Sequence, residues 1–199
     1  MGKAGNINEL CNTCTYGVMK EKIKERARLL HDIEVNQKYD THPYSYHLFS
    51  VASIAEEYMK SYFGLEEDSD LFNALYFAAC FHDSIEDARL TYNDVKKIAA
   101  DFIKEEKNII LATEIVYALT NEKGRNRDER ANDKYYSGIR HTSYAPFLKL
   151  CDRYANMLYS KETGSRMLDV YKRELPEFLE HIKVDRYLPI DLLNKIREL

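Results

Sequence analysis

The segment from Leu71 to His82, with the sequence LFNALYFAACFH, is apolar on almost every side. Its length fits about three turns of α-helix. A helix that is hydrophobic all round has to be surrounded by other parts of the protein. The segment therefore predicts a central helix with further helices packed around it.

Helical spacing of apolar residues recurs along the rest of the chain, whereas strand-like alternation is scarce. Thr91 is expected to cap a helix, with Asp94 at its third position. The apolar stripes and buried runs lie at residues 19–30, 47–58, 109–119 and 147–158, and one or two further helices are expected within 164–199. We predict an all-α fold, a single-domain helical bundle over residues 1–199.

Composition excludes several classes of protein. The chain is 45% hydrophobic with only 7 Gly and 4 Pro, unlike collagen-like or disordered chains. A formal net charge of -4 gives no bulk electrostatic reason to bind nucleic acid. A mean hydropathy of -0.54, with no apolar run of about 18 residues, predicts no membrane span.

The cysteines and the N-terminus bear on the cellular compartment. No apolar segment of the secretory type follows the N-terminus, so we expect a cytoplasmic protein with reduced thiols. Cys11 and Cys14 form a CxxC pair that is either redox-active or half of a zinc site, although no second CxxC is present. Cys80 and Cys151 lie in apolar helical runs and are expected to be buried.

A group of acidic residues and a histidine closes the central helix. His82 and Asp83 end the apolar run, and Glu86 and Asp87 follow each of them by four residues. If the helix continues by one turn, the four side chains share one end and roughly one side. Three carboxylates crowded there would repel one another, and a divalent cation is the simple remedy.

Two residues on other predicted helices complete a candidate metal site. His47 lies on the same apolar stripe as Val51, and Asp152 lies beside a buried face. Taken singly, a histidine on an apolar face is more often a core residue, and a helical Asp is more often a cap or an ion-pair partner. Together with His82 and Asp83 they predict a four-ligand nitrogen and oxygen set with open positions for water and substrate.

Such a site would stay negatively charged through Glu86 and Asp87, so a phosphate group would need basic side chains nearby. Lys149 and Arg153 flank Asp152 in the sequence. Residues 121–134 add further charge, which is either a solvated helix face or a phosphate clamp. We expect a subset of these cations to bind substrate phosphates, with arginine preferred, and Arg125 and Arg130 are among the candidates.

The order of these residues resembles the HD superfamily of metal-dependent phosphohydrolases. Four segments are similar to the hydrolase domain of RelA/SpoT enzymes and its stand-alone metazoan homologue. They are HPYSYHLFSVASIA (42–55), FHDSIEDARLT (81–91), LTNEKGRNRDER (119–130) and LKLCDRYANM (148–157). The likeness covers about residues 20–160, and the chain departs from the pattern at Ala88 and Tyr159.

The resemblance implies a manganese ion, or another divalent metal, bound by His47, His82, Asp83 and Asp152. It implies that Glu86 and Asp87 position or deprotonate the attacking water. Asn156 and Lys38 match positions that contact the substrate or the metal surroundings.

The implied activity is removal of pyrophosphate from the 3′ position of guanosine tetraphosphate. Alternatives are another HD phosphohydrolase, acting on nucleoside monophosphates or cyclic nucleotides, and a nucleotide-binding HD module without turnover. The expected partner is a small nucleotide, with no nucleic acid and no membrane, and a homo-oligomer remains open.

Overall fold

The computed structural model describes residues 17–199, with only the backbone described at positions 127 and 128. The predicted Cys11/Cys14 pair therefore lies outside the described residues. The elements, in chain order, are α1 (Val18–Arg28), the π-helical turn η2 (Leu29–Glu34), β1 (Lys38–Tyr39), β2 (His42–Pro43), α2 (Ser45–Ser61), α3 (Asp70–Phe81), α4 (Tyr92–Ala99), α5 (Glu106–Leu119), α6 (Arg127–Arg130), α7 (Asp133–His141), α8 (Ala145–Glu162), α9 (Met167–His181), η3 (Asp185–Tyr187) and α10 (Ile190–Arg197). The fold is an all-α bundle, as predicted.

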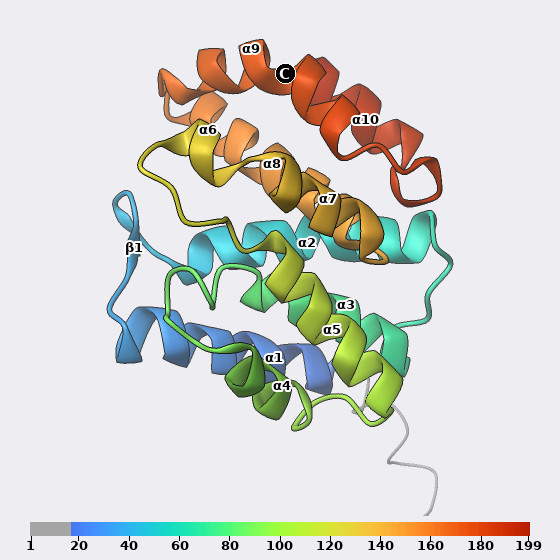
Figure 1. The fold of residues 1–199 in the computed structure, drawn as a ribbon. Helices are drawn as coiled ribbons and strands as arrows, with labels where there is room; N and C mark the ends of the chain where they lie inside the picture. The colour runs from blue at the N-terminus through green and yellow to red at the C-terminus, as the bar shows by residue number, and fades with distance from the viewer. Residues whose placement is uncertain (1–16) are drawn as a thin grey trace, which may run out of the picture.

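Helix α3 is the centre of the bundle, which confirms the expectation from its composition. Every residue from Phe72 to Phe81 is buried. The helix packs against α1, α2 and α5. Figure 1 shows α1 and α4 on one side of α3 and the helices from α7 to α10 on the other side. Ser69 caps its start by accepting a hydrogen bond from the backbone N–H of Phe72.

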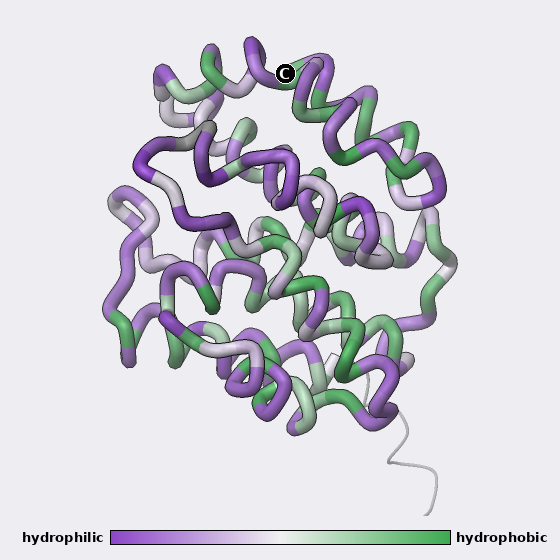
Figure 2. The backbone as a smooth tube through the Cα atoms, viewed as in Figure 1, coloured by the Kyte–Doolittle hydropathy of each residue, from purple (hydrophilic) through white to green (hydrophobic). Residues whose placement is uncertain are grey.

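The predicted helix stripes face one continuous core. Buried residues of α1, α2, α3, α5, α7 and α8 belong to the same cluster, with Leu175, Phe178, Leu192 and Ile196 adding the C-terminal helices. Figure 2 shows the hydrophobic residues concentrated on the inner segments, whereas the connection from α5 to α7 is mostly hydrophilic. Cys80 and Cys151 are buried free thiols, as expected. Within residues 17–199, no helix is both long enough and apolar enough to span a bilayer.

Two local features differ from the predicted pattern. The first long helix changes from an α-helix to the π-helix η2 at Leu29. It is followed by a short antiparallel pair of strands, in which Lys38 pairs with Pro43 and Tyr39 pairs with His42. At the other end of the core, α3 ends at Phe81 and the chain continues as turns through Asp87 instead of as a regular helix.

Helix α2 packs against both α3 and α8, and this arrangement positions the candidate site. His47 lies near the start of α2, His82 is the C-cap of α3, and Asp152 lies in the first half of α8. The three helices therefore bring side chains that are distant in sequence to one place.

Candidate metal centre

The structure brings the side chains of the four predicted metal ligands together. His82 Nε2 lies 2.9 Å from Asp83 Oδ2, and His47 Nε2 lies 3.7 Å from the same oxygen. Asp152 Oδ1 lies 3.3 Å from His47 Nε2 and 3.9 Å from His82 Nε2. Ligand atoms that share an ion at about 2.0–2.2 Å are separated by similar distances. One potential ligand atom from each of His47, His82 and Asp83 lies within 4.8 Å of the other two.

The hydrogen bonding of His82 fits a metal ligand. Its Nδ1 lies 2.9 Å from the carbonyl oxygen of Ala79, to which it donates a proton. The other ring nitrogen, Nε2, is buried and has no hydrogen-bond partner among the described residues, although Asp83 is close to it. A backbone carbonyl on one imidazole nitrogen typically fixes the tautomer that leaves the second nitrogen for an ion. The residues present thus fit a divalent cation.

Electrostatics in the centre shift the pKa values of its members strongly. Burial alone would lower the pKa of His82, but the charges of Asp83 and Asp152 outweigh it and raise the pKa to about 9. Burial alone would raise the pKa of Asp83, but His82 and His47 outweigh it and hold the pKa below its usual range. In the metal-free protein, the imidazole proton therefore supplies positive charge that the two carboxylates require.

Asp152 is held in place by residues of its own helix. Lys149 Nζ donates a 2.9 Å hydrogen bond to Asp152 Oδ2, and Asn156 Nδ2 donates a 2.6 Å bond to Oδ1. The amide oxygen of Asn156 accepts a 2.8 Å bond from the hydroxyl of Tyr39. The Tyr39 ring stacks on His47, with centroids 4.7 Å apart. These contacts fix the orientation of two candidate ligands.

Asp87 lies beside the predicted ligands, connected through Tyr44. Tyr44 Oη lies 2.7 Å from Asp83 Oδ2 and 2.6 Å from Asp87 Oδ2. Burial and the charges of Asp83 and Asp87 raise the pKa of Tyr44, so the hydroxyl keeps its proton near neutral pH. The turn after α3 sets this geometry, because the Asp87 N–H bonds to the Asp83 carbonyl at 2.8 Å.

Glu86 faces a different direction from Asp87. Its carboxylate accepts hydrogen bonds from the side-chain amide of Asn121, the shorter one 2.9 Å long, and lies 3.9 Å from Arg130. The condition under which the four groups at residues 82–87 would share one side, a further turn of regular helix, is therefore not met. The physical reason is that the chain leaves the helical path after Phe81.

A cavity of about 700 Å³ opens beside the candidate metal centre. Asp152, Lys149 and Asn156 form the wall that it shares with the centre, and Glu86 lies on its rim with Arg130. The remaining walls come from the segment before α7, from α7 and from α9. This cavity is a suitable place for a substrate whose reacting group reaches the centre.

The predicted phosphate-binding residues are placed unequally. Lys149 and Arg130 line the cavity, whereas Arg125 is 91% exposed and bound to Glu129. Lys38 is exposed on β1. The Arg153 side chain is 8% exposed, pairs with Glu174 at 3.3 Å, and lies over the rings of Tyr171 and Phe178.

Sequence reasoning assigned no role to Tyr39, Tyr44 and His31. The ring of His31 stacks on Tyr44, with centroids 5.2 Å apart, and its Nδ1 lies 2.9 Å from Gln37 Oε1. The only available signal was proximity to His47 in the sequence, which several other tyrosines share.

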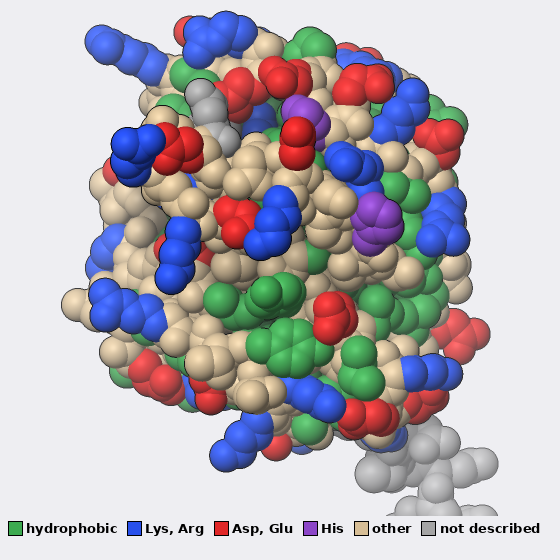
Figure 3. All heavy atoms as spheres, in the orientation of Figure 1, with side chains coloured by type: hydrophobic (Ala, Val, Ile, Leu, Met, Phe, Trp, Pro, Cys, Tyr) green, Lys and Arg blue, Asp and Glu red, His purple; other side chains and the backbone are tan. Residues whose placement is uncertain are grey.

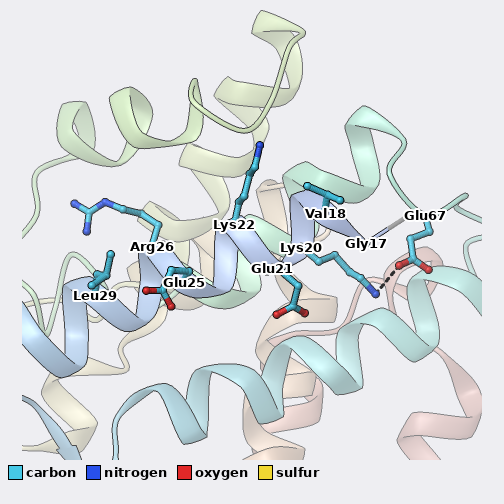
Figure 4. Close-up of a pocket in the computed structure, with 9 residues that line it drawn as sticks. All are labelled: Gly17, Val18, Lys20, Glu21, Lys22, Glu25, Arg26, Leu29 and Glu67. Atoms are coloured by element: carbon cyan, nitrogen blue, oxygen red, sulfur yellow. Dashed lines mark ion pairs between the residues drawn. The ribbon is translucent and has the colours of Figure 1, made fainter. Parts of the chain in front are cut away.

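A second cavity lies along α1, away from the predicted ligands. Figure 4 shows its lining residues, where Lys20 pairs with Glu67 at 2.6 Å. Lys20 also pairs with Glu56 at 2.7 Å. The charge of this partly buried lysine is thus already neutralised within the protein.

No model of a known protein family matches this chain, and comparison with curated proteins gives no match either.

Proposed function

We propose that the protein is a metal-dependent phosphohydrolase. The observation that carries the proposal is the convergence of His47 of α2, His82 and Asp83 at the end of α3, and Asp152 of α8. Each imidazole Nε2 lies 2.9–3.9 Å from one oxygen of Asp83 and one oxygen of Asp152. Two neutral imidazoles and two carboxylates are a typical set for a catalytic divalent ion, and manganese is the ion that the resemblance favours. A bound divalent ion lowers the pKa of a water molecule enough to supply hydroxide near neutral pH.

Residues of the chain account for the remaining chemical requirements. Asp87, linked to the centre through Tyr44, can accept the proton of the attacking water. Lys149 and Asn156 fix Asp152, so the ligand set is preorganised. Arg130, on the rim of the cavity, can bind a phosphate oxygen of the substrate.

The motif resemblance makes guanosine tetraphosphate the first substrate to test, with pyrophosphate as the expected product. One observation favours the alternative of a less charged substrate such as a nucleoside monophosphate. Acidic side chains outnumber basic ones in the cavity lining, with Glu86, Asp133, Asp152, Glu174 and Glu177 against Arg130, Lys149 and Arg153. Figure 3 likewise shows acidic and basic side chains interspersed on one face, without a broad basic field.

The cytoplasm remains the expected compartment, since nucleotide substrates are found there. A non-catalytic nucleotide-binding module is the third alternative. It would differ from an enzyme by retaining nucleotide without releasing phosphate or pyrophosphate.

The test is a manganese-loaded sample assayed against guanosine tetraphosphate, nucleoside monophosphates and cyclic nucleotides, with the phosphate product identified. We expect hydrolysis that Asp83→Ala abolishes together with manganese binding. Asp101→Ala, which changes an exposed acid between α4 and α5, is the matched control and should retain both. Metal binding without turnover of any of these substrates would exclude the proposed hydrolase and support the binding module.

A further inference from the structure

Tyr44 lies between two acidic side chains with different proposed roles: Asp83, a candidate metal ligand, and Asp87, a candidate proton acceptor. Its hydroxyl oxygen lies 2.7 Å from Asp83 Oδ2, which is itself 2.9 Å from His82 Nε2 and 3.7 Å from His47 Nε2, and 2.6 Å from Asp87 Oδ2. A phenol has one proton and donates to one carboxylate at a time. The hydroxyl is therefore the direct link between a candidate ligand and a candidate proton acceptor.

The position of this hydroxyl is fixed from several sides. The Tyr44 ring is 9% exposed and is stacked on His31 at an interplanar angle of 16°. His47 contacts it edge-on, with centroids 5.9 Å apart. The next residue, Ser45, is anchored through its backbone N–H and its hydroxyl, which donate to Asp32 at 2.9 Å and 2.6 Å. The ring would therefore keep its place even without the two carboxylates.

We propose that Tyr44 is a positioning residue, whose hydroxyl holds the Asp87 carboxylate beside Asp83 in the orientation that accepts a proton from the attacking water. The proposal rests on the proposed function. Without the hydroxyl, two like charges would face each other with no donor between them. Asp87 lies on the turn after α3 and is half-buried, so it can rotate toward solvent.

A double-mutant cycle tests this role, because it separates a residue that acts through Asp87 from one that supports the fold. We expect Tyr44→Phe to lower kcat about 10- to 100-fold with KM nearly unchanged. Asp87→Asn should lower kcat by at least as much, and the double variant should be no worse than Asp87→Asn alone. Losses that multiply in the double variant would overturn the proposal.

Manganese affinity, measured by calorimetry on the same four proteins, gives a readout that does not depend on turnover. In the wild-type background the Asp87 charge lies near the ion site, so Asp87→Asn should weaken manganese binding about 10-fold. In the Tyr44→Phe background the same change should alter the Kd by less than about twofold. Equal effects in both backgrounds would contradict the proposal.

Two controls distinguish the possible failures. Tyr58→Phe removes the hydroxyl of another buried tyrosine of α2, and it should change neither kcat nor manganese affinity. If the wild type binds manganese but hydrolyses no phosphate substrate, the proposed function fails and the affinity cycle alone decides the role of Tyr44. If wild-type protein binds no divalent ion, the positioning role is excluded as well.

Discussion

Lys149 and Asp152 form a largely buried ion pair in the wall between the candidate metal centre and the cavity. They lie three residues apart on α8 with a 2.9 Å contact, and their side chains are 18% and 12% exposed. Burial alone would lower the pKa of Lys149, but Asp152 and Tyr135 raise it above its ordinary value. The ammonium group therefore stays charged and compensates one carboxylate of the candidate ligand set.

Removing this cation should destabilise the metal-free protein. Lys149→Met leaves the Asp152 charge buried without the lysine cation that pairs with it, and we expect a loss of about 3 kcal/mol in the free energy of unfolding. Saturating manganese should reduce the loss, because the ion supplies positive charge at the same carboxylate. Urea denaturation with and without manganese measures both values.

The matched control for that variant is Lys134→Met. Lys134 is 79% exposed and pairs with Glu122, so its loss should cost less than about 1 kcal/mol. An equal loss for Lys149→Met with and without manganese would show that Asp152 is not part of an ion site.

The raised pKa of His82 predicts how stability varies with pH in the metal-free protein. The folded-state pKa is about 9, against about 6.5 in an unfolded chain. The protonated imidazole therefore stabilises the fold fully below about pH 6.5, and this contribution is lost as the pH rises through 9. We expect a decrease of about 3 kcal/mol across that window, measured by denaturation in chelator. His82→Asn should flatten the dependence, and an unchanged slope in that variant would refute the assignment.

The same shift predicts proton release on metal binding. A metal ion binds His82 through the lone pair of Nε2. In the metal-free protein at neutral pH this nitrogen carries a proton, which has to leave before the ion can bind. Manganese binding at pH 7 should therefore release about one proton. Calorimetry in buffers of different ionisation enthalpy measures this number, and a binding enthalpy that is independent of buffer would contradict the prediction.

Arg153 should contribute to stability more than to substrate binding. Its guanidinium group pairs with Glu174 and lies 4.2 Å from the centroid of Phe178, so it joins α8 to α9. We expect Arg153→Ala to lower the free energy of unfolding by about 2 kcal/mol. Arg166→Ala, at an exposed residue before α9, should change it by less than about 0.5 kcal/mol. A large rise in KM for Arg153→Ala without loss of stability would instead support the original phosphate-binding assignment.

The capping box of α4 offers a test of the fold that leaves the metal centre intact. The Thr91 side chain accepts a hydrogen bond from the Asp94 N–H, and Asp94 accepts one from the Thr91 N–H at 2.9 Å. Thr91→Ala should cost about 1 kcal/mol of unfolding free energy. Manganese affinity should not change, and a shift in affinity would mean that α4 influences the centre.

Most of the core helices, although not α7, and the four candidate ligands could be predicted from the amino-acid sequence. Helix periodicity and caps depend on residues within a few positions of one another, so the Leu71–His82 run and the Thr91 cap are readable locally. His47, His82 and Asp152 lie at the inward faces or ends of such helices, and burial of those faces drew them together.

The neighbours that surround these residues depend on how the helices and turns pack in three dimensions. The direction of the chain after Phe81 separates Glu86 from Asp87, and helical periodicity does not encode that turn. Tyr39, on the short ladder at residues 38–43, reaches the centre through a hydrogen bond to Asn156 of α8, a contact between residues more than 100 positions apart. Such contacts depend on how whole helices pack, and no local pattern in the chain specifies them.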